Sequence, residues 1–190
     1  QMRGFSAMGL AALTPAQLAM LSATQVGALT AVQVKGLTET QLSNLSATQL
    51  GGFNSTVLSN LSTTQFGALT ATQIAMLTPV QMSGLGASVI ESLSAAQLQG
   101  LTATQIKALT TPQVRGLTAT QLGSLNANQF GALTPTQIGA LTTSTLSALG
   151  TAEIAALSST QLGGLTAAGF AALTITQIQA LTTSQMASLS

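Results

Sequence analysis

Cysteine, histidine, tryptophan and tyrosine are absent from this sequence, and only 4% of its residues are charged. The lack of cysteine excludes a disulfide framework. The four lysines and arginines are spread from Arg3 to Arg115 and the net charge is only +1, so they cannot form the basic track that binds nucleic acid. We therefore expect no nucleic-acid partner.

Acidic residues are also scarce. Catalysis needs titratable groups that the fold brings together, and the three acidic residues, Glu39, Glu91 and Glu153, lie far apart in the sequence. We expect no catalytic, cofactor-binding or metal-binding residues, and we do not expect an enzyme. The sequence accordingly predicts no cofactor and no small-molecule substrate.

Long apolar runs are missing, although 46% of the residues are hydrophobic. Thr, Ser and Gln interrupt the apolar residues so often that no run approaches the roughly 18 residues of a membrane-spanning helix. We expect no membrane span.

The sequence consists instead of one octapeptide, repeated with small edits. Leu101–Ala108, Leu-Thr-Ala-Thr-Gln-Ile-Lys-Ala, is a complete repeat, and its residues define positions 1 to 8. Leucine recurs at position 1 every eight residues from Leu13 to Leu189, interrupted only by Phe53. Position 2 is usually Thr or Ser, position 5 is usually Gln, position 6 is a large apolar residue and position 8 is small. Such regular repetition predicts a repeat architecture.

Four positions of the octapeptide predict the start of a helix. Thr102 followed by Gln105 matches a capping box, in which the hydroxyl accepts from the Gln N–H and the Gln side chain accepts from the Thr N–H. The apolar residues on either side, Leu101 and Ile106, match the hydrophobic staple that accompanies such a cap. We expect a short helix from position 3 to about position 8.

Residues that depart from the consensus repeat agree with this interpretation. Pro15, Pro79 and Pro135 occupy position 3, the first helical position, where proline is favoured. Pro112 lies one residue later, where its missing N–H would have no partner within the helix. Glu39 at position 3 and Glu153 at position 5 lie near the positive end of a helix dipole.

Two other architectures compete with a solenoid of short helices. In one continuous helix at about 100° per residue, an eight-residue period would drift by roughly 80° per repeat, so the leucines would face every direction. A strand needs apolar residues at even spacing, whereas positions 1 and 6 are five residues apart. Because Thr and Ile favour strands, a narrow β-solenoid stays open as the alternative. The sequence predicts an all-α solenoid of very short helices, one per repeat.

Position 7 is predicted to lie on the solvent-exposed surface of this solenoid. Arg3, Lys35, Glu91, Lys107 and Arg115 all occupy it, so it must face water. Small residues at position 8 allow either a close approach of backbones or the end of the helix.

The octapeptide register is unbroken, which predicts one continuous array over residues 1–190, with 23 complete repeats in residues 5–188 and no domain boundary. Since the first and last residues fall inside incomplete repeats, we interpret the chain as a window of a longer tract. One such helix is too short to be stable alone. Stability must come from neighbouring repeats stacked above and below, as in other solenoids.

Repeats such as Leu133–Ala140 and Leu173–Ala180 resemble the Leu-Thr-x-x-Gln-Ile/Val-x-Ala-Leu tracts of very large bacterial secreted or cell-surface proteins, often labelled as adhesins or haem-utilisation proteins. The resemblance implies an extracellular or cell-surface structural segment. It does not imply haem binding here, because the chain has no His, Cys or Tyr to ligate iron.

The composition favours a structural role. Uniform repetition and very little charge to keep chains apart predict self-association into a filament, sheath, matrix fibre or adhesin stalk. The alternative is a surface that presents threonine to ice or a polysaccharide, suggested by Thr-x-Thr at positions 2 and 4 as in Thr70–Thr72 and Thr118–Thr120. If position 2 is a cap, only position 4 can form such a surface.

Overall fold

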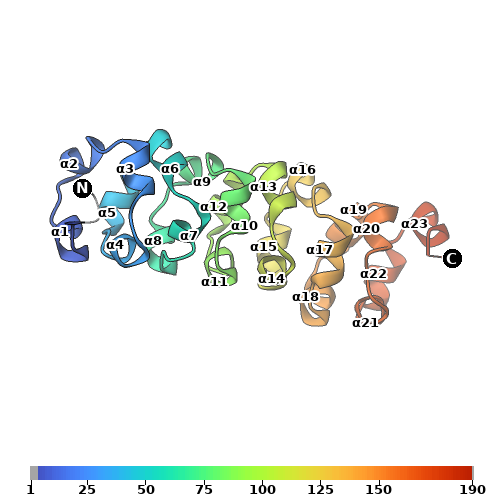
Figure 1. The fold of residues 1–190 in the computed structure, drawn as a ribbon. Helices are drawn as coiled ribbons and strands as arrows, with labels where there is room; N and C mark the ends of the chain where they lie inside the picture. The colour runs from blue at the N-terminus through green and yellow to red at the C-terminus, as the bar shows by residue number, and fades with distance from the viewer. Residues whose placement is uncertain (1–3, 190) are drawn as a thin grey trace. The chain divides into compact units, whose positions relative to one another are not determined.

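Residues 4–189 are described by a computed structural model, and their regular structure consists of 23 short α-helices without a strand (Figure 1). One helix forms in each repeat. The predicted all-α solenoid is therefore confirmed, and the β-solenoid alternative is wrong. No helix in this range is long and apolar enough to cross a membrane.

The chain divides into two compact units, residues up to Gly100 and residues from Leu101 onward. The first unit contains α1 (Ala7–Ala11), α2 (Pro15–Ala19), α3 (Ala23–Gly27), α4 (Ala31–Lys35), α5 (Glu39–Ser43), α6 (Ala47–Gly52), α7 (Ser55–Leu58), α8 (Thr63–Gly67), α9 (Ala71–Ala75), α10 (Pro79–Ser83), α11 (Ala87–Glu91) and α12 (Ala95–Gly100). The second contains α13 (Ala103–Ala108), α14 (Thr111–Arg115), α15 (Ala119–Gly123), α16 (Ala127–Gly131), α17 (Pro135–Ala140), α18 (Thr143–Ala148), α19 (Thr151–Ala156), α20 (Ser159–Leu162), α21 (Ala167–Ala171), α22 (Ile175–Gln179) and α23 (Thr183–Ala187).

The helices begin where the capping box predicts. At the start of α13 the Gln105 N–H donates to the Thr102 hydroxyl at 3.2 Å, and the Thr102 N–H donates to Gln105 Oε1 at 2.8 Å. Pro15, Pro79 and Pro135 are the first residues of their helices. Pro112 is the second residue of α14, so its missing N–H also falls in the first turn.

Most helices end one residue earlier than expected, at position 7. The residue at position 8 then serves as the C-cap in right-handed geometry, as at Ala28 with φ −85° and ψ 0°. None of the residues from 4 to 189 has a positive φ, so the left-handed helix end that glycine often forms is not used here. The chain leaves the helix through an extended position 1, for example Leu141 with φ −60° and ψ 142°.

Within each unit the helices wind into a superhelix in which a helix contacts the one three repeats further along. Such pairs include α1 with α4 and α3 with α6 in the first unit, and α14 with α17 and α20 with α23 in the second. The hydrogen bonds that join successive turns span 28 residues. One superhelical turn therefore contains about three and a half octapeptides, a value that the octapeptide alone does not determine.

The core of each unit is a double column of apolar side chains. Position 6 supplies one column, in which Ile74 and Ile106 are completely buried, and position 1 supplies the other, in which Leu77 and Leu101 are 3% exposed. Burial of these columns supplies the stability that the short helices lack alone.

Position 8 is small because the backbones of successive turns meet there. A Cβ atom at Gly52 would collide with the carbonyl oxygen of Ala23, and one at Gly164 would collide with that of Pro135. Both roles predicted for position 8 are found, because it lies at the helix end, as at Ala28, and its glycines meet the backbone of the neighbouring turn.

Candidate functional site

The position 5 glutamine is the polar group around which each repeat is built. In α5, Gln41 Oε1 accepts from the N–H of Thr38 at 2.9 Å, as the capping box predicts. Its Nε2 donates to the carbonyl oxygens of Leu10 at 2.8 Å and Leu13 at 2.7 Å, in the preceding superhelical turn. The side chain is only 2% exposed. One amide therefore caps the start of its own helix and satisfies carbonyls beyond the end of another.

The same arrangement recurs along both units. Wherever the bond spans 28 residues, the distance from Nε2 to the position 1 carbonyl oxygen is 2.6–2.9 Å, as for Gln33, Gln41, Gln49, Gln65, Gln73, Gln81, Gln97, Gln129, Gln137, Gln161, Gln177 and Gln185. The capping role predicted for glutamine is confirmed. Its second role was missed, although the last carbonyls of every helix need donors from outside the helix.

Charged side chains lie on the surface at position 7, as predicted. Lys35, Glu91, Lys107 and Arg115 are exposed, whereas Arg3 lies outside the described residues. Across residues 4–189, no group of three or more Asp, Glu, His or Cys residues could hold a metal ion. The fold thus leaves the few titratable groups dispersed.

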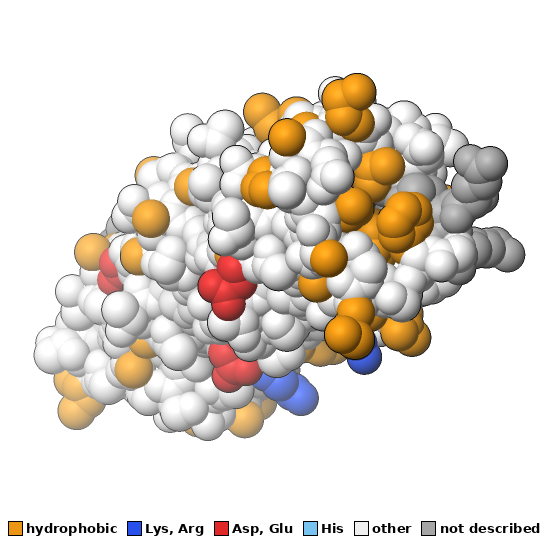
Figure 2. All heavy atoms as spheres, turned by 90° about the vertical axis from the view of Figure 1, so that its left-hand side faces the viewer, with side chains coloured by type: hydrophobic (Ala, Val, Ile, Leu, Met, Phe, Trp, Pro, Cys, Tyr) orange, Lys and Arg blue, Asp and Glu red, His pale blue; other side chains and the backbone are white. Residues whose placement is uncertain are grey.

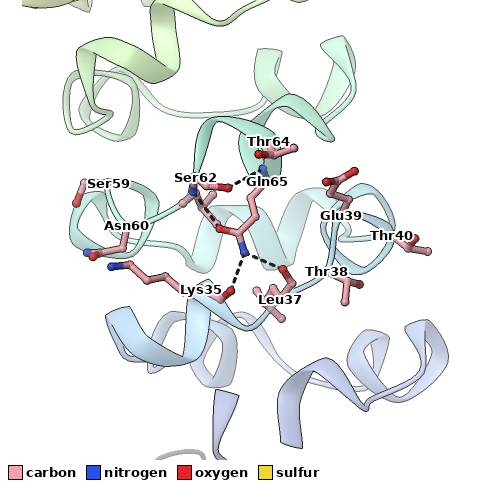
Figure 3. Close-up of a pocket in the computed structure, with 11 residues that line it drawn as sticks. Lys35, Leu37, Thr38, Glu39, Thr40, Ser59, Asn60, Ser62, Thr64 and Gln65 are labelled. Atoms are coloured by element: carbon pink, nitrogen blue, oxygen red, sulfur yellow. Dashed lines mark hydrogen bonds between the residues drawn. The ribbon is translucent and has the colours of Figure 1, made fainter. Parts of the chain in front are cut away.

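The first unit contains one open polar groove of about 940 Å³ (Figure 3). Gln65 lies at its centre and donates through Nε2 to the carbonyl oxygens of Lys35 at 3.2 Å and Leu37 at 2.7 Å. In this view Lys35 and Glu39 lie on opposite sides of Gln65. The remaining lining residues are Thr38, Thr40, Ser59, Asn60, Leu61, Ser62 and Thr64. With one cation, one carboxylate and several hydroxyls, the groove can hydrogen-bond a polar molecule but offers no nucleophile with an adjacent base.

The threonines at positions 2 and 4 differ in their surroundings. The Thr118 hydroxyl accepts from the Gln121 N–H at 3.1 Å and donates to Gln121 Oε1 at 3.2 Å, so position 2 is engaged in capping. Thr120 and Thr136 at position 4 are exposed. Position 2 threonines such as Thr118 are also exposed, but their hydroxyls are used in capping, so position 4 is the one whose hydroxyl is not part of the cap.

The burial of methionine depends on its position in the repeat. Met82 at position 6 is completely buried, but Met20 and Met76 at position 8 are 83% and 52% exposed. Met186, at position 6 of the last helix, is 47% exposed. Position 8 lies at the helix end, where a long side chain extends into solvent instead of the core.

The fold and its repeated glutamine bonds define a tandem-repeat solenoid of short helices. Among known families, residues 111–143 match the model of the ALTTAQ repeat. The matched segment runs from the first residue of α14 to the first residue of α18. A search of curated proteins found no match.

Proposed function

We propose that this chain is a structural repeat segment of a bacterial extracellular or cell-surface protein, where it forms or spans a filament, sheath, matrix fibre or adhesin stalk. The observation that carries the proposal is the recurring bond from a position 5 amide to the preceding turn, 2.7 Å long between Gln137 Nε2 and the Leu109 carbonyl oxygen. Because these bonds recur repeat after repeat, each octapeptide extends the array by the same step and distributes tension over many equivalent contacts.

The proposed partner is another copy of the same chain. The face shown in Figure 2 carries few charged side chains among neutral and apolar ones. Large apolar side chains are exposed away from the core, with Val32, Val80 and Ile175 at 69%, 71% and 75%. A nearly neutral surface offers little electrostatic repulsion between chains, and exposed apolar groups favour their contact.

The proposal assigns the chain no enzymatic activity, cofactor, nucleic acid or small-molecule substrate. It is supported by the dispersed charges and by the glutamine amides, whose hydrogen-bonding groups are already used within the fold.

The test is electron microscopy and sedimentation velocity of the purified chain at rising concentration, with helical content followed by circular dichroism. We expect filaments or laterally associated bundles that shorten or disappear in a variant carrying Val32→Lys, Val80→Lys and Ile175→Lys. A matched control carries Thr24→Lys, Thr72→Lys and Thr160→Lys, which add the same charge at exposed threonines. A chain that stays monomeric at every concentration would rule out self-association, and equal loss of assembly in both variants would rule out the apolar contacts.

The second candidate is a threonine-presenting surface that binds ice or a polysaccharide. It is favoured by the exposure of position 4 threonines such as Thr120 and Thr136. If it is correct, the chain produces thermal hysteresis or sediments with an insoluble polysaccharide, and Thr120→Lys with Thr136→Lys weakens the effect. No hysteresis and no co-sedimentation of the parent chain would end this candidate.

A further inference from the structure

One repeat carries a carboxylate at the position where most others carry the glutamine amide. Glu153, the third residue of α19, occupies position 5 and is half-buried. A Cβ atom at Gly150, the N-cap of α19, would collide with Glu153 Oε2. A Cβ atom at Gly123, in the preceding turn, would lie 3.7 Å from Glu153 Oε1. The carboxylate is thus oriented as the amides are, with one oxygen toward its own helix start and the other toward the preceding turn.

The amide that Glu153 replaces normally faces a cluster of carbonyl oxygens. Gln41 Nε2 lies 2.8, 3.4 and 2.7 Å from the carbonyl oxygens of the residues 31, 30 and 28 positions earlier. Gln137 and Gln177 repeat this set with distances from 2.7 to 3.4 Å. The same spacing from Glu153 gives the carbonyls of Leu122, Gly123 and Leu125. A carboxylate cannot donate to any of them, because it carries only acceptors.

One position 1 side chain is less buried at this place than its equivalents. From Leu29 to Leu157 the position 1 side chains are buried, with the exception of Leu125, which is half-buried. Repeats in which Val57, Val89, Thr145 or Gly169 replaces the glutamine leave the corresponding residue, Leu29, Leu61, Leu117 or Leu141, buried. The loss of the amide alone therefore does not expose the position 1 side chain. The greater exposure of Leu125 coincides with the carboxylate at Glu153.

We propose that Glu153 and the carbonyl oxygens of Leu122, Gly123 and Leu125 bind a calcium ion. Calcium is bound by carboxylate and backbone carbonyl oxygens together with water, in a flexible geometry of six to eight ligands. Water completes the ligand set, since Leu125 and Glu153 are both partly exposed. The ion supplies the positive charge that the amide N–H groups supply elsewhere in the array. A single carboxylate makes the site weak, in the millimolar range typical of extracellular modules.

Magnesium fits this site less well. It requires a nearly ideal octahedron with short bonds and gives up its water reluctantly. The oxygens here belong to two superhelical turns whose separation is set by helix packing, so they suit the larger and more adaptable ion.

The experiment measures the thermal unfolding of the whole 190-residue chain against millimolar CaCl₂ at constant ionic strength, with isothermal titration calorimetry for direct binding. We expect calcium to raise the Tm by a few degrees, magnesium to raise it less and NaCl to leave it unchanged. In Glu153→Gln the consensus amide returns, so the Tm is higher without calcium and no longer responds to it. The matched control, Glu91→Gln, removes an exposed carboxylate at position 7 and keeps the calcium response.

Three outcomes would overturn the assignment. They are a parent chain whose Tm and calorimetric signal do not respond to calcium, a response of equal size in Glu153→Gln, and an equal response to sodium at the same ionic strength. Because folding is measured directly, these outcomes do not depend on whether the chain assembles into filaments.

Discussion

Gln41 Nε2 and the carbonyl oxygen of Leu13 lie 2.7 Å apart although 28 residues separate them in the sequence. A short helix would normally leave its last carbonyls to solvent or to a glycine at its end. Here the glutamine of the next superhelical turn satisfies them, so the start of one helix and the end of another depend on the same side chain. This coupling lets helices of four to six residues persist in a long array.

Removal of one such amide should destabilise the fold. Gln137→Leu retains a side chain of similar size but leaves the carbonyls of Ile106 and Leu109 without the donors seen at 3.0 and 2.7 Å. We expect a loss of about 1–3 kcal/mol in the free energy of unfolding, measured by urea denaturation. Gln179→Leu at the exposed position 7 is the control and should change stability by less than about 0.5 kcal/mol. Equal effects of the two substitutions would contradict the double role of the amide.

The position 2 hydroxyl should contribute less than the glutamine. In the structure the Gln137 N–H donates to the Thr134 hydroxyl at 3.2 Å, and Thr134→Ala removes this acceptor. We expect a loss of about 1 kcal/mol in the free energy of unfolding. Thr136→Ala, two residues later on the exposed face, is the control. Combining the substitution with its equivalents in other repeats should lower the Tm stepwise. An unchanged Tm would mean that the side-chain caps do not stabilise the helices.

Substitution by alanine at the two adjacent glycines of α6 should change the stability of the fold in opposite directions. Nothing lies within 4 Å of a Cβ atom at Gly51, so Gly51→Ala should stabilise the helix by up to about 1 kcal/mol. Gly52→Ala would place its Cβ atom against the Ala23 carbonyl and should cost about 1–3 kcal/mol. Thermal melts of the two variants test this, and stabilisation by Gly52→Ala would show that the turns are less tightly packed than described.

Features that arise from interactions within one repeat were predictable from the sequence. Features that arise from contacts between two superhelical turns were not. The Thr102 and Gln105 cap, the prolines in the first turn and the exposed position 7 all follow from interactions within about eight residues. The length of the superhelical turn, about 28 residues, depends on how successive helices pack and where their backbones meet. A single octapeptide does not contain this information. For the same reason the partial exposure of Leu125 could not be predicted, because Glu153, the residue at the matching place in the next turn, is 28 residues away.

The turn of 28 residues and the repeat of eight have a consequence for how such a protein can change by gene duplication. Glutamines such as Gln41 bond to the repeats three and four before them, so whole octapeptides can be gained or lost without breaking the bonding rule. Within a unit, however, each added repeat rotates everything after it by a little less than a third of a turn, since about three and a half octapeptides make one turn. A given face therefore returns near its original direction after about seven repeats. Duplication in blocks of about this size would lengthen the solenoid and preserve its faces, whereas a single added repeat would redirect the surfaces beyond the insertion.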